Sequence, residues 1–490
     1  MSEGGPGNYA QRSGRIRNVE VRSIDYVPLS ERHGKVWHQG PFWFTGNFVL
    51  VTALTGFIGP SLGLSVGWAV LAIVLGACFG TFFMAFHANQ GPRLGLPQMI
   101  QSRAQFGLQG AVIPFAATVF IYIGFNVFDV IVATDAFQTV LPVGPDWIWY
   151  SLLIGLAVLI AIVGYDLLHL VQRWLSPLLI AMFAVLTIAT LVLYGDAIFE
   201  HGRGFIWTGF LTQFSAAAGY QVSYAVYVSD YSRYLPENVS APGVISWTYL
   251  GAAGSAAWLM SLGALLASAF PNPDIISSIQ QVGNELVPGL GTFVVVASAP
   301  ALVTIMGVNV YGAMLTGASA VDAFRPVTPT LRVRIIGIVA ISLVVLVIAL
   351  SIPSQYLDSF NTFVLLMLYF LVPWTAVNLV DFYLVRHGHY AITEIYNPDG
   401  IYGRWGWRGM IAYIVGFAAM VPFFVTSFYT GPIASMLGGA DISFAVGLLV
   451  SGLLYFAFTR SLDLSREMPV IETSRRQLEE TAAVEGRTRQ

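Results

Sequence analysis

The chain has 490 residues, of which 56% are hydrophobic and 10% are charged, and its formal net charge is -3. Soluble globular chains carry about 25% charged residues, so this composition excludes a soluble enzyme, and the near balance of charge excludes a disordered or nucleic-acid-binding chain. The single cysteine, Cys78, excludes an internal disulfide and a cysteine-based metal site. The remaining class is an all-α polytopic protein embedded in a lipid bilayer.

Twelve stretches are long and apolar enough to cross a bilayer as helices, which takes about 20 mostly apolar residues. Short connections between them leave no room for an inserted soluble domain. We therefore expect a twelve-helix membrane domain over 41–460, between polar, mobile tails at 1–40 and 461–490. The first 40 residues hold no apolar run, so no cleavable signal peptide is expected. The predicted spans lie at about 41–64, 66–88, 109–139, 148–166, 173–194, 207–230, 242–268, 288–316, 330–352, 358–384, 408–429 and 441–459.

Basic residues predict the orientation of these spans, because arginine and lysine gather on the cytoplasmic side. Of the 23 basic residues, 22 fall in the two tails and in alternate loops, and only Arg203 falls on the opposite side. Both termini are therefore predicted to be cytoplasmic, which an even number of spans allows. All basic residues except Lys35 are arginines, which is typical of a GC-rich bacterial genome, so we expect the inner membrane of a bacterium.

The first and sixth predicted spans carry the interruptions that are typical of transporters built from inverted repeats. The first contains Gly46-Asn47, and the sixth contains Gly219-Tyr220-Gln221. Spans five apart occupy equivalent positions in a five-plus-five inverted repeat, in which backbone freed at the two glycines would bind a substrate. The glycines could instead only allow close helix packing. The neighbouring amides favour a site, because they need partners in hydrocarbon.

Asp129, in the third span, is the only ionisable residue that lies clearly inside a predicted span. Phe125 and Asn126 lie on the same helix face. An aromatic ring, an amide and a carboxyl group on one stripe suit a flat heterocycle with polar edges. Asp129 could instead bind a neighbouring helix, but a charged carboxylate at that depth costs several kcal/mol. A protonated carboxyl costs less, which makes Asp129 a candidate proton carrier.

The eighth span adds Asn309, with Tyr311 nearby, to the candidate substrate site. Asn309 could equally join two helices. The sequence contains no phosphate loop, nucleophile elbow or metal-ligand spacing. We therefore expect neither an enzyme, nor a cofactor, nor transport driven by ATP.

Three loops between the predicted spans carry distinctive motifs. The loop after the second span reads GPRLGLPQMIQSRAQFG over 91–107 and resembles the signature loop of the nucleobase–cation symporters. The segment SDYSRY at 229–234 and the segments at 381–386 and 395–402 are similar to it too. The resemblance covers about residues 20–460, and the branch it points to is that of the purine–cytosine permeases.

This resemblance implies a LeuT-type fold, with repeat one over 41–200, repeat two over 201–386 and two extra helices over 408–459. Members of the family carry purines, pyrimidines, hydantoins, allantoin, thiamine or vitamin B6-like compounds together with sodium or protons. The heterocycle stacks on aromatic side chains of spans 3 and 6, which are similar in position to Phe125 and Tyr220. The hydrogen-bonding residue of span 3 matches Asp129, or Asn126 after a small shift. Asn309 matches the first asparagine of span 8, while Ala313 stands where other members have a second asparagine.

The same resemblance predicts a degenerate sodium site. Its carbonyl positions correspond to Thr45, Phe48 and Thr304, and its hydroxyl positions to Gly307 and Val308, which have no side-chain oxygen. A hard cation needs about six oxygen ligands. We therefore predict coupling to protons rather than sodium, with Asp129 as the carrier.

Together these features predict a secondary active transporter that imports a nucleobase or related heterocycle by alternating access. The substrate would bind among Phe125, Asn126, Asp129, Gly219, Tyr220, Gln221, Asn309, Tyr311 and the Gly46-Asn47 break. The alternatives are a sodium-coupled or uncoupled permease for allantoin, hydantoin, thiamine or a vitamin B6-like compound, or a carrier of cationic amines with ionised Asp129 as counter-charge. A ligand-binding receptor is a different class, which the short loops disfavour.

Overall fold

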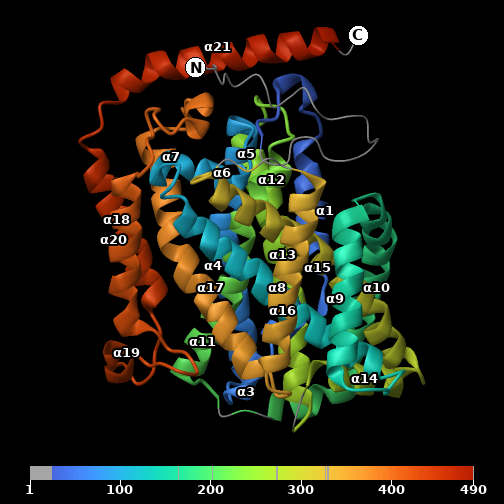
Figure 1. The fold of residues 1–490 in the computed structure, drawn as a ribbon. Coiled ribbons are helices and arrows are strands. Elements are labelled where there is room, and N and C mark those ends of the chain that lie inside the picture. The colour runs from blue at the N-terminus through green and yellow to red at the C-terminus, as the bar shows by residue number, and fades with distance from the viewer. Residues whose placement is uncertain are drawn as a thin grey trace.

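The computed structural model describes residues 25–163, 165–200, 202, 204–271, 274–325, 327 and 330–488. Long helices stand side by side within these ranges, and short helices lie at both ends of the bundle (Figure 1). The one strand-like pairing in the described part of the chain is an isolated bridge between Val425 and Thr430. Residues 1–24, Arg203 and the last two residues of the C-terminal tail lie outside the described residues, so the predictions made for them are not addressed.

The α-helices vary from single turns to more than 30 residues. In chain order they are α1 (Gln39–Gly46), α2 (Leu50–Thr55), α3 (Ile58–Ser61), α4 (Val66–Ala88), α5 (Gln90–Leu94), α6 (Gln98–Gln101), α7 (Arg103–Phe106), α8 (Val112–Gln138), α9 (Asp146–Val163), α10 (Tyr165–Glu200), α11 (Trp207–Ser223), α12 (Val228–Ser232), α13 (Ala241–Ala269), α14 (Ile275–Leu286), α15 (Leu290–Asp322), α16 (Leu331–Ser351), α17 (Leu357–Leu379), α18 (Trp407–Met420), α19 (Pro432–Met436), α20 (Ser443–Thr459) and α21 (Leu464–Thr488).

Seven helical segments of the described chain are long and apolar enough to cross a membrane unaided, and nine are if each of two bent pairs counts as one span. The helices α9 and α18 are shorter and apolar. Each of the twelve predicted spans overlaps a helix. The all-α membrane class is therefore confirmed, while the count of twelve stays a prediction. The seven segments are Val66–Leu94, Val112–Gln138, Leu175–Glu200, Ala241–Ala269, Leu290–Asp322, Leu331–Ser351 and Leu357–Val385.

The first span is broken where the sequence predicted it. Helix α1 ends at Gly46, Val49 is extended with φ -134° and ψ 152°, and α2 begins at Leu50. The axes on the two sides of the break differ by 71°. The β-branched side chain of Val49 favours this extended conformation. The Asn47 amide holds the break by donating to the carbonyl oxygen of Ala252 on α13, at 3.1 Å.

The sixth span is broken at a different place from the predicted one. Helix α11 continues through Gly219, and the regular helix gives way to a 3-10 turn, η4 (Tyr224–Val226), and to Tyr227 before α12 begins. A Cβ atom on Gly219 would lie 2.3 Å from the carbonyl oxygen of Val364 on α17. The prediction of freed backbone at Gly219 is therefore wrong. The glycine allows close packing, which was the alternative.

Helix α8 lies along α15, and α11 and α13 lie along α4. Helices α5, α6, α7 and α12 gather at one end of the bundle, where α21 lies across them, and α3, α14 and α19 lie at the opposite end (Figure 1). These contacts bring the third, sixth and eighth predicted spans near the two breaks in the interior of the bundle.

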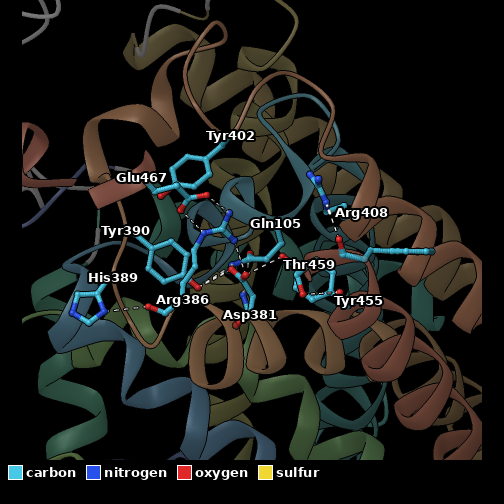
Figure 2. A network of polar contacts seen from close by, with 12 residues as sticks. Gln105, Asp381, Arg386, His389, Tyr390, Tyr402, Arg408, Tyr455, Thr459 and Glu467 are labelled. Carbon is cyan, nitrogen blue, oxygen red and sulfur yellow. Dashed lines mark hydrogen bonds and ion pairs between the residues drawn. The ribbon is translucent and has the colours of Figure 1, made fainter. Parts of the chain in front are cut away.

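The C-terminal tail was predicted to be mobile, but α21 is a docked helix. The guanidinium group of Arg386, directly after the π-helical segment η5 (Val380–Val385) that extends α17, donates to both carboxylate oxygens of Glu467 on α21, at 2.9 and 3.0 Å. It also forms an ion pair with Asp381 (Figure 2). Burial by itself lowers the pKa of Arg386, but Asp381 and Glu467 together raise it well above its ordinary value, so the guanidinium stays charged.

Asp381 is fully buried and is held by three further donors (Figure 2). One of its oxygens accepts from the hydroxyl of Tyr455 at 2.9 Å, and the other accepts from Tyr390 at 2.8 Å and from the Gln105 amide at 2.7 Å. Helix α20, the chain after α17 and the segment α7 therefore all meet at this one carboxylate.

We expect Glu467→Gln to loosen α21, because glutamine cannot pair with Arg386 through two charged oxygens. Charge-assisted hydrogen bonds contribute about 1.5–3 kcal/mol. Hydrogen exchange of the α21 amides should accelerate by tenfold or more. Glu472→Gln, which changes an exposed carboxylate on the same helix, is the matched control. Equal exchange in the two variants would mean that Glu467 does not anchor α21.

Candidate functional site

Helix α8 presents Phe125, Asn126 and Asp129 to the interior, and all three are buried. The ring of Phe125 meets the ring of Tyr220 on α11 edge to face, with 5.4 Å between the centroids. The structure thus brings together the two aromatic residues that the resemblance assigns to substrate stacking. Phe363 of α17 lies edge-on against Phe125 as well, also at 5.4 Å, so a third span contributes an aromatic ring that the sequence reasoning missed.

The hydroxyl of Tyr220 hydrogen-bonds to that of Thr52 at 2.7 Å. Thr52 lies in the first turn of α2, directly after the break in the first span. Thr52 was not predicted from the sequence. Its only sequence signal is its position five residues after Asn47. A second contact joins the two breaks, because the Tyr224 hydroxyl donates to the carbonyl oxygen of Gly46 at 3.4 Å.

We expect Thr52→Val to weaken substrate binding by about two- to tenfold, because a hydrogen bond contributes about 0.5–1.5 kcal/mol and this one orients the Tyr220 ring. Thr55→Val is the matched control, because the Thr55 hydroxyl donates to the Val51 carbonyl of its own helix. Equilibrium binding of radiolabelled substrate measures both. Equal affinities would show that the bond to Tyr220 does not shape the site.

Three buried side-chain oxygens on α8 have no hydrogen-bond partner in the described part of the chain: Oδ1 of Asn126, Oδ2 of Asp129 and, further along the helix, Oγ1 of Thr134. The Asn126 amide nitrogen donates to the carbonyl oxygen of Met306 on α15, at 3.3 Å. Buried polar atoms are nearly always paired in folded proteins. Unpaired oxygens beside an aromatic pair are therefore suited to hydrogen-bond a ligand.

The side chains of Asn47 and Gln221 contact α13 rather than the Phe125–Tyr220 pair. Both amide nitrogens donate to the carbonyl oxygen of Ala252 on α13, at 3.1 and 3.2 Å. The second contact of Asn47 is with Ser255 and that of Gln221 is with Thr81, both through hydroxyl groups. These contacts tie α1 and α11 to α13 and α4. Both residues therefore join helices through their side-chain nitrogens. The side-chain oxygen of each has no hydrogen-bond partner among the described residues.

Asn309 and Tyr311 lie on different faces of α15. Asn309 is buried and follows Met306 by three residues, so it shares the face that contacts Asn126 on α8. Tyr311 comes two residues later, about 200° around the helix. Its ring lies under the guanidinium group of Arg334 on α16, at 4.6 Å. The structure does not bring Tyr311 to the aromatic pair.

The side of α15 at Gly307 is filled by α9. A Cβ atom on Gly307 would lie 2.7 Å from Cγ2 of Ile160, so α15 and α9 pack closely at this position. Neither Gly307 nor Val308 has a side-chain oxygen. Among the remaining positions of the predicted sodium site, the Thr304 hydroxyl donates to the Pro300 carbonyl of its own helix. The Thr45 carbonyl accepts from the Phe48 amide at 3.1 Å.

The sequence of the chain matches a known protein family. A family model described as permease for cytosine/purines, uracil, thiamine and allantoin matches residues 26–447. The chain belongs to this permease family. It is therefore a multi-pass membrane transporter and not an enzyme, and the resemblance seen in the loops is confirmed.

Individual members of the family match this permease along most of its length. The putative purine-cytosine permease YxlA of Bacillus subtilis (strain 168) is 39% identical over 90% of this chain and 96% of its own. The purine-cytosine permease FCY2 of Saccharomyces cerevisiae is 26% identical over 89% of this chain and 85% of its own. The inward-facing structure of Mhp1 superposes with a TM-score of 0.73 at 19% identity, covering 91% of this chain and 94% of its own. That likeness confirms the predicted fold class.

Proposed function

We propose that this permease imports a purine, cytosine or closely related heterocycle together with a proton, by alternating access across the inner membrane of a bacterium. The observation that supports this most directly is the contact between Phe125 and Tyr220 beside the unpaired oxygens of Asn126 and Asp129. The names of two relatives, the putative purine-cytosine permease YxlA and the purine-cytosine permease FCY2, support the substrate class.

In this proposal the flat ring stacks on Phe125 and Tyr220, and its polar edge faces α8. Cytosine and adenine carry an amino donor next to a ring-nitrogen acceptor. A protonated carboxyl group offers the complementary pair, one donor and one acceptor, so protonated Asp129 would hold such an edge by two hydrogen bonds. An ionised carboxylate only accepts and would lose one of them. Proton and substrate would therefore bind with mutually raised affinity.

Sodium coupling is disfavoured because two of the five oxygen positions that sodium would need are occupied by Gly307 and Val308. The experiment is uptake of radiolabelled cytosine, adenine and hypoxanthine into proteoliposomes. Accumulation driven by an inward proton gradient is expected. Accumulation that follows a sodium gradient at fixed pH and membrane potential would overturn proton coupling.

The alternative substrate, a cationic amine, is favoured by the single carboxyl of Asp129, which would serve as its counter-charge. Inhibition of uptake by competing compounds distinguishes a heterocyclic substrate from a cationic amine. Under our proposal purines and cytosine inhibit uptake, whereas organic amines do not. A thermal-shift screen with nucleobases, allantoin, hydantoin and thiamine then ranks the heterocycles on the purified protein.

A further inference from the structure

A row of tyrosines continues from the Phe125–Tyr220 pair toward the end of the bundle where α12 lies. They are spaced four, three and four residues apart: Tyr220, Tyr224, Tyr227 and Tyr231. Ring centroids are 6.0 Å apart between the first two and 5.6 Å apart between the second and third. Tyr231, the last of the row, is 39% exposed. The row therefore leads from the buried aromatic pair to the surface.

Aromatic rings from two other helices face this row. Trp43 of α1 lies 5.9 Å from Tyr224 and 5.5 Å from Tyr231. Tyr122 of α8 lies 5.8 Å from Tyr227, and their planes differ by only 20°. Most contacts along the row are tilted or edge to face, so a near-parallel pair is distinct among them.

The Tyr122–Tyr227 pair joins the same two spans as the Phe125–Tyr220 pair, although its rings are near-parallel rather than edge to face. In both pairs, α8 contributes one ring and the sixth span contributes the other. Tyr122 precedes Phe125 by three residues, almost one helical turn. The second pair therefore lies one step nearer to the α12 end of the bundle, with Tyr227 at the break in the sixth span, directly before α12.

Polar groups and free space adjoin Tyr122 of this second pair. A pocket of about 40 Å³ is lined by Tyr122, Val226, Asp230 and Gly312, among other residues, and Tyr227 directly follows Val226 in the chain. One oxygen of Asp230 accepts from the backbone amide of Gln98 at 2.7 Å. Gly312 leaves room for the tyrosine ring, because a Cβ there would lie 2.7 Å from Cζ of Tyr122.

We propose that Tyr122 and Tyr227 form a second substrate site, which we call the exit site, where the heterocycle stacks after it leaves Phe125 and Tyr220. Amino or ring N–H groups of the heterocycle would face the carboxylate of Asp230. A flat ring sandwiched between two others needs about 7 Å between their planes, twice the stacking distance of about 3.4 Å. The centroids of the two tyrosine rings are 5.8 Å apart, so the rings must separate before the heterocycle can enter. A movement of Tyr227, which directly precedes the short helix α12, away from α8 would open this space.

This inference rests on the proposed function, because it takes the α12 end as cytoplasmic and the substrate as a flat heterocycle. Its test is the substrate concentration that gives half-maximal exchange, measured from each side in right-side-out and inside-out membrane vesicles. Tyr227→Leu removes a stacking ring and should raise the cytoplasmic value by about fivefold or more, since a base loses at least that affinity with an aromatic partner. The external value should stay within twofold. Tyr227→Phe, which keeps the ring, should raise the cytoplasmic value less than Tyr227→Leu does.

Gly312→Ala provides a second variant that removes no ring. Its added methyl group presses on Tyr122 and should also raise only the cytoplasmic value. If neither variant changes the cytoplasmic value, or if each changes both sides equally while the wild type transports nucleobases, the exit site is refuted and the proposed function stands. Wild-type vesicles that exchange no nucleobase would refute the proposed function and the exit site with it.

Discussion

Asp129→Asn is expected to abolish proton-driven accumulation of the substrate while sparing exchange of substrate for substrate. Asparagine keeps the size of the side chain and still offers one donor and one acceptor to a bound ring, but it binds no proton. The wild type should concentrate its substrate about tenfold for each unit of pH gradient, because one pH unit corresponds to about 1.36 kcal/mol per proton. The variant should equilibrate its substrate at an inside-to-outside ratio near one.

Asp135→Asn is the matched control for this experiment, since it removes a carboxyl group from the same helix, six residues further on. It should keep the accumulation ratio of the wild type. Accumulation by Asp129→Asn equal to that of the wild type would show that another group carries the proton. Loss of both exchange and binding in that variant would favour the cationic substrate, for which the carboxylate charge is indispensable.

The two breaks show how far local sequence determines this fold. The Gly46-Asn47 pair followed by β-branched Val49 signals a helix end, and the helix ends there. Gly219 carries the same signal, yet its missing side chain serves the contact with Val364. The break in the sixth span occurs instead at Tyr224–Val226 and Tyr227, a segment without glycine or proline. Tertiary packing therefore sets that position.

The candidate site likewise contains residues that the sequence predicted and residues that it could not predict. The resemblance identified Phe125 and Tyr220, which the structure brings into contact. Thr52 and Phe363 could not be found, because a contact between helices depends on their rotation and separation, and neither is encoded in the pattern of one span. Tyr311 is a different case, since helical periodicity alone separates it from Asn309 by about 200°.

The ion pair between Asp381 and Arg386 could not be predicted by assuming a regular α-helix. Residues five apart lie about 140° away from each other on an α-helix. Here residues 380–385 form a π-helix, η5 (Val380–Val385), in which the amide of Arg386 donates to the carbonyl oxygen of Asp381 at 2.8 Å. In π-helical geometry residues five apart stack on one face, so the two side chains meet.

Asp381→Asn is therefore expected to lower the free energy of unfolding by about 3–5 kcal/mol, the usual cost of breaking a buried ion pair by removing one partner, and Glu467 then remains as the carboxylate partner of Arg386. Asp399→Asn is the matched control, because Asp399 pairs with Arg404 at the surface, where the two side chains are 79% and 54% exposed. Such pairs contribute about 0–1 kcal/mol. Denaturant unfolding of the purified variants measures both, and similar losses for the two would refute a special role for Asp381.

A double variant tests the cause of this loss. If the cost of Asp381→Asn comes from Arg386 remaining charged and buried, adding Arg386→Gln should restore part of the stability rather than lower it further. Two independent losses would instead add. Partial restoration would show that the carboxylate acts mainly by neutralising the guanidinium group, and the anchoring of α21 through Glu467 would then be a second function of the same arginine.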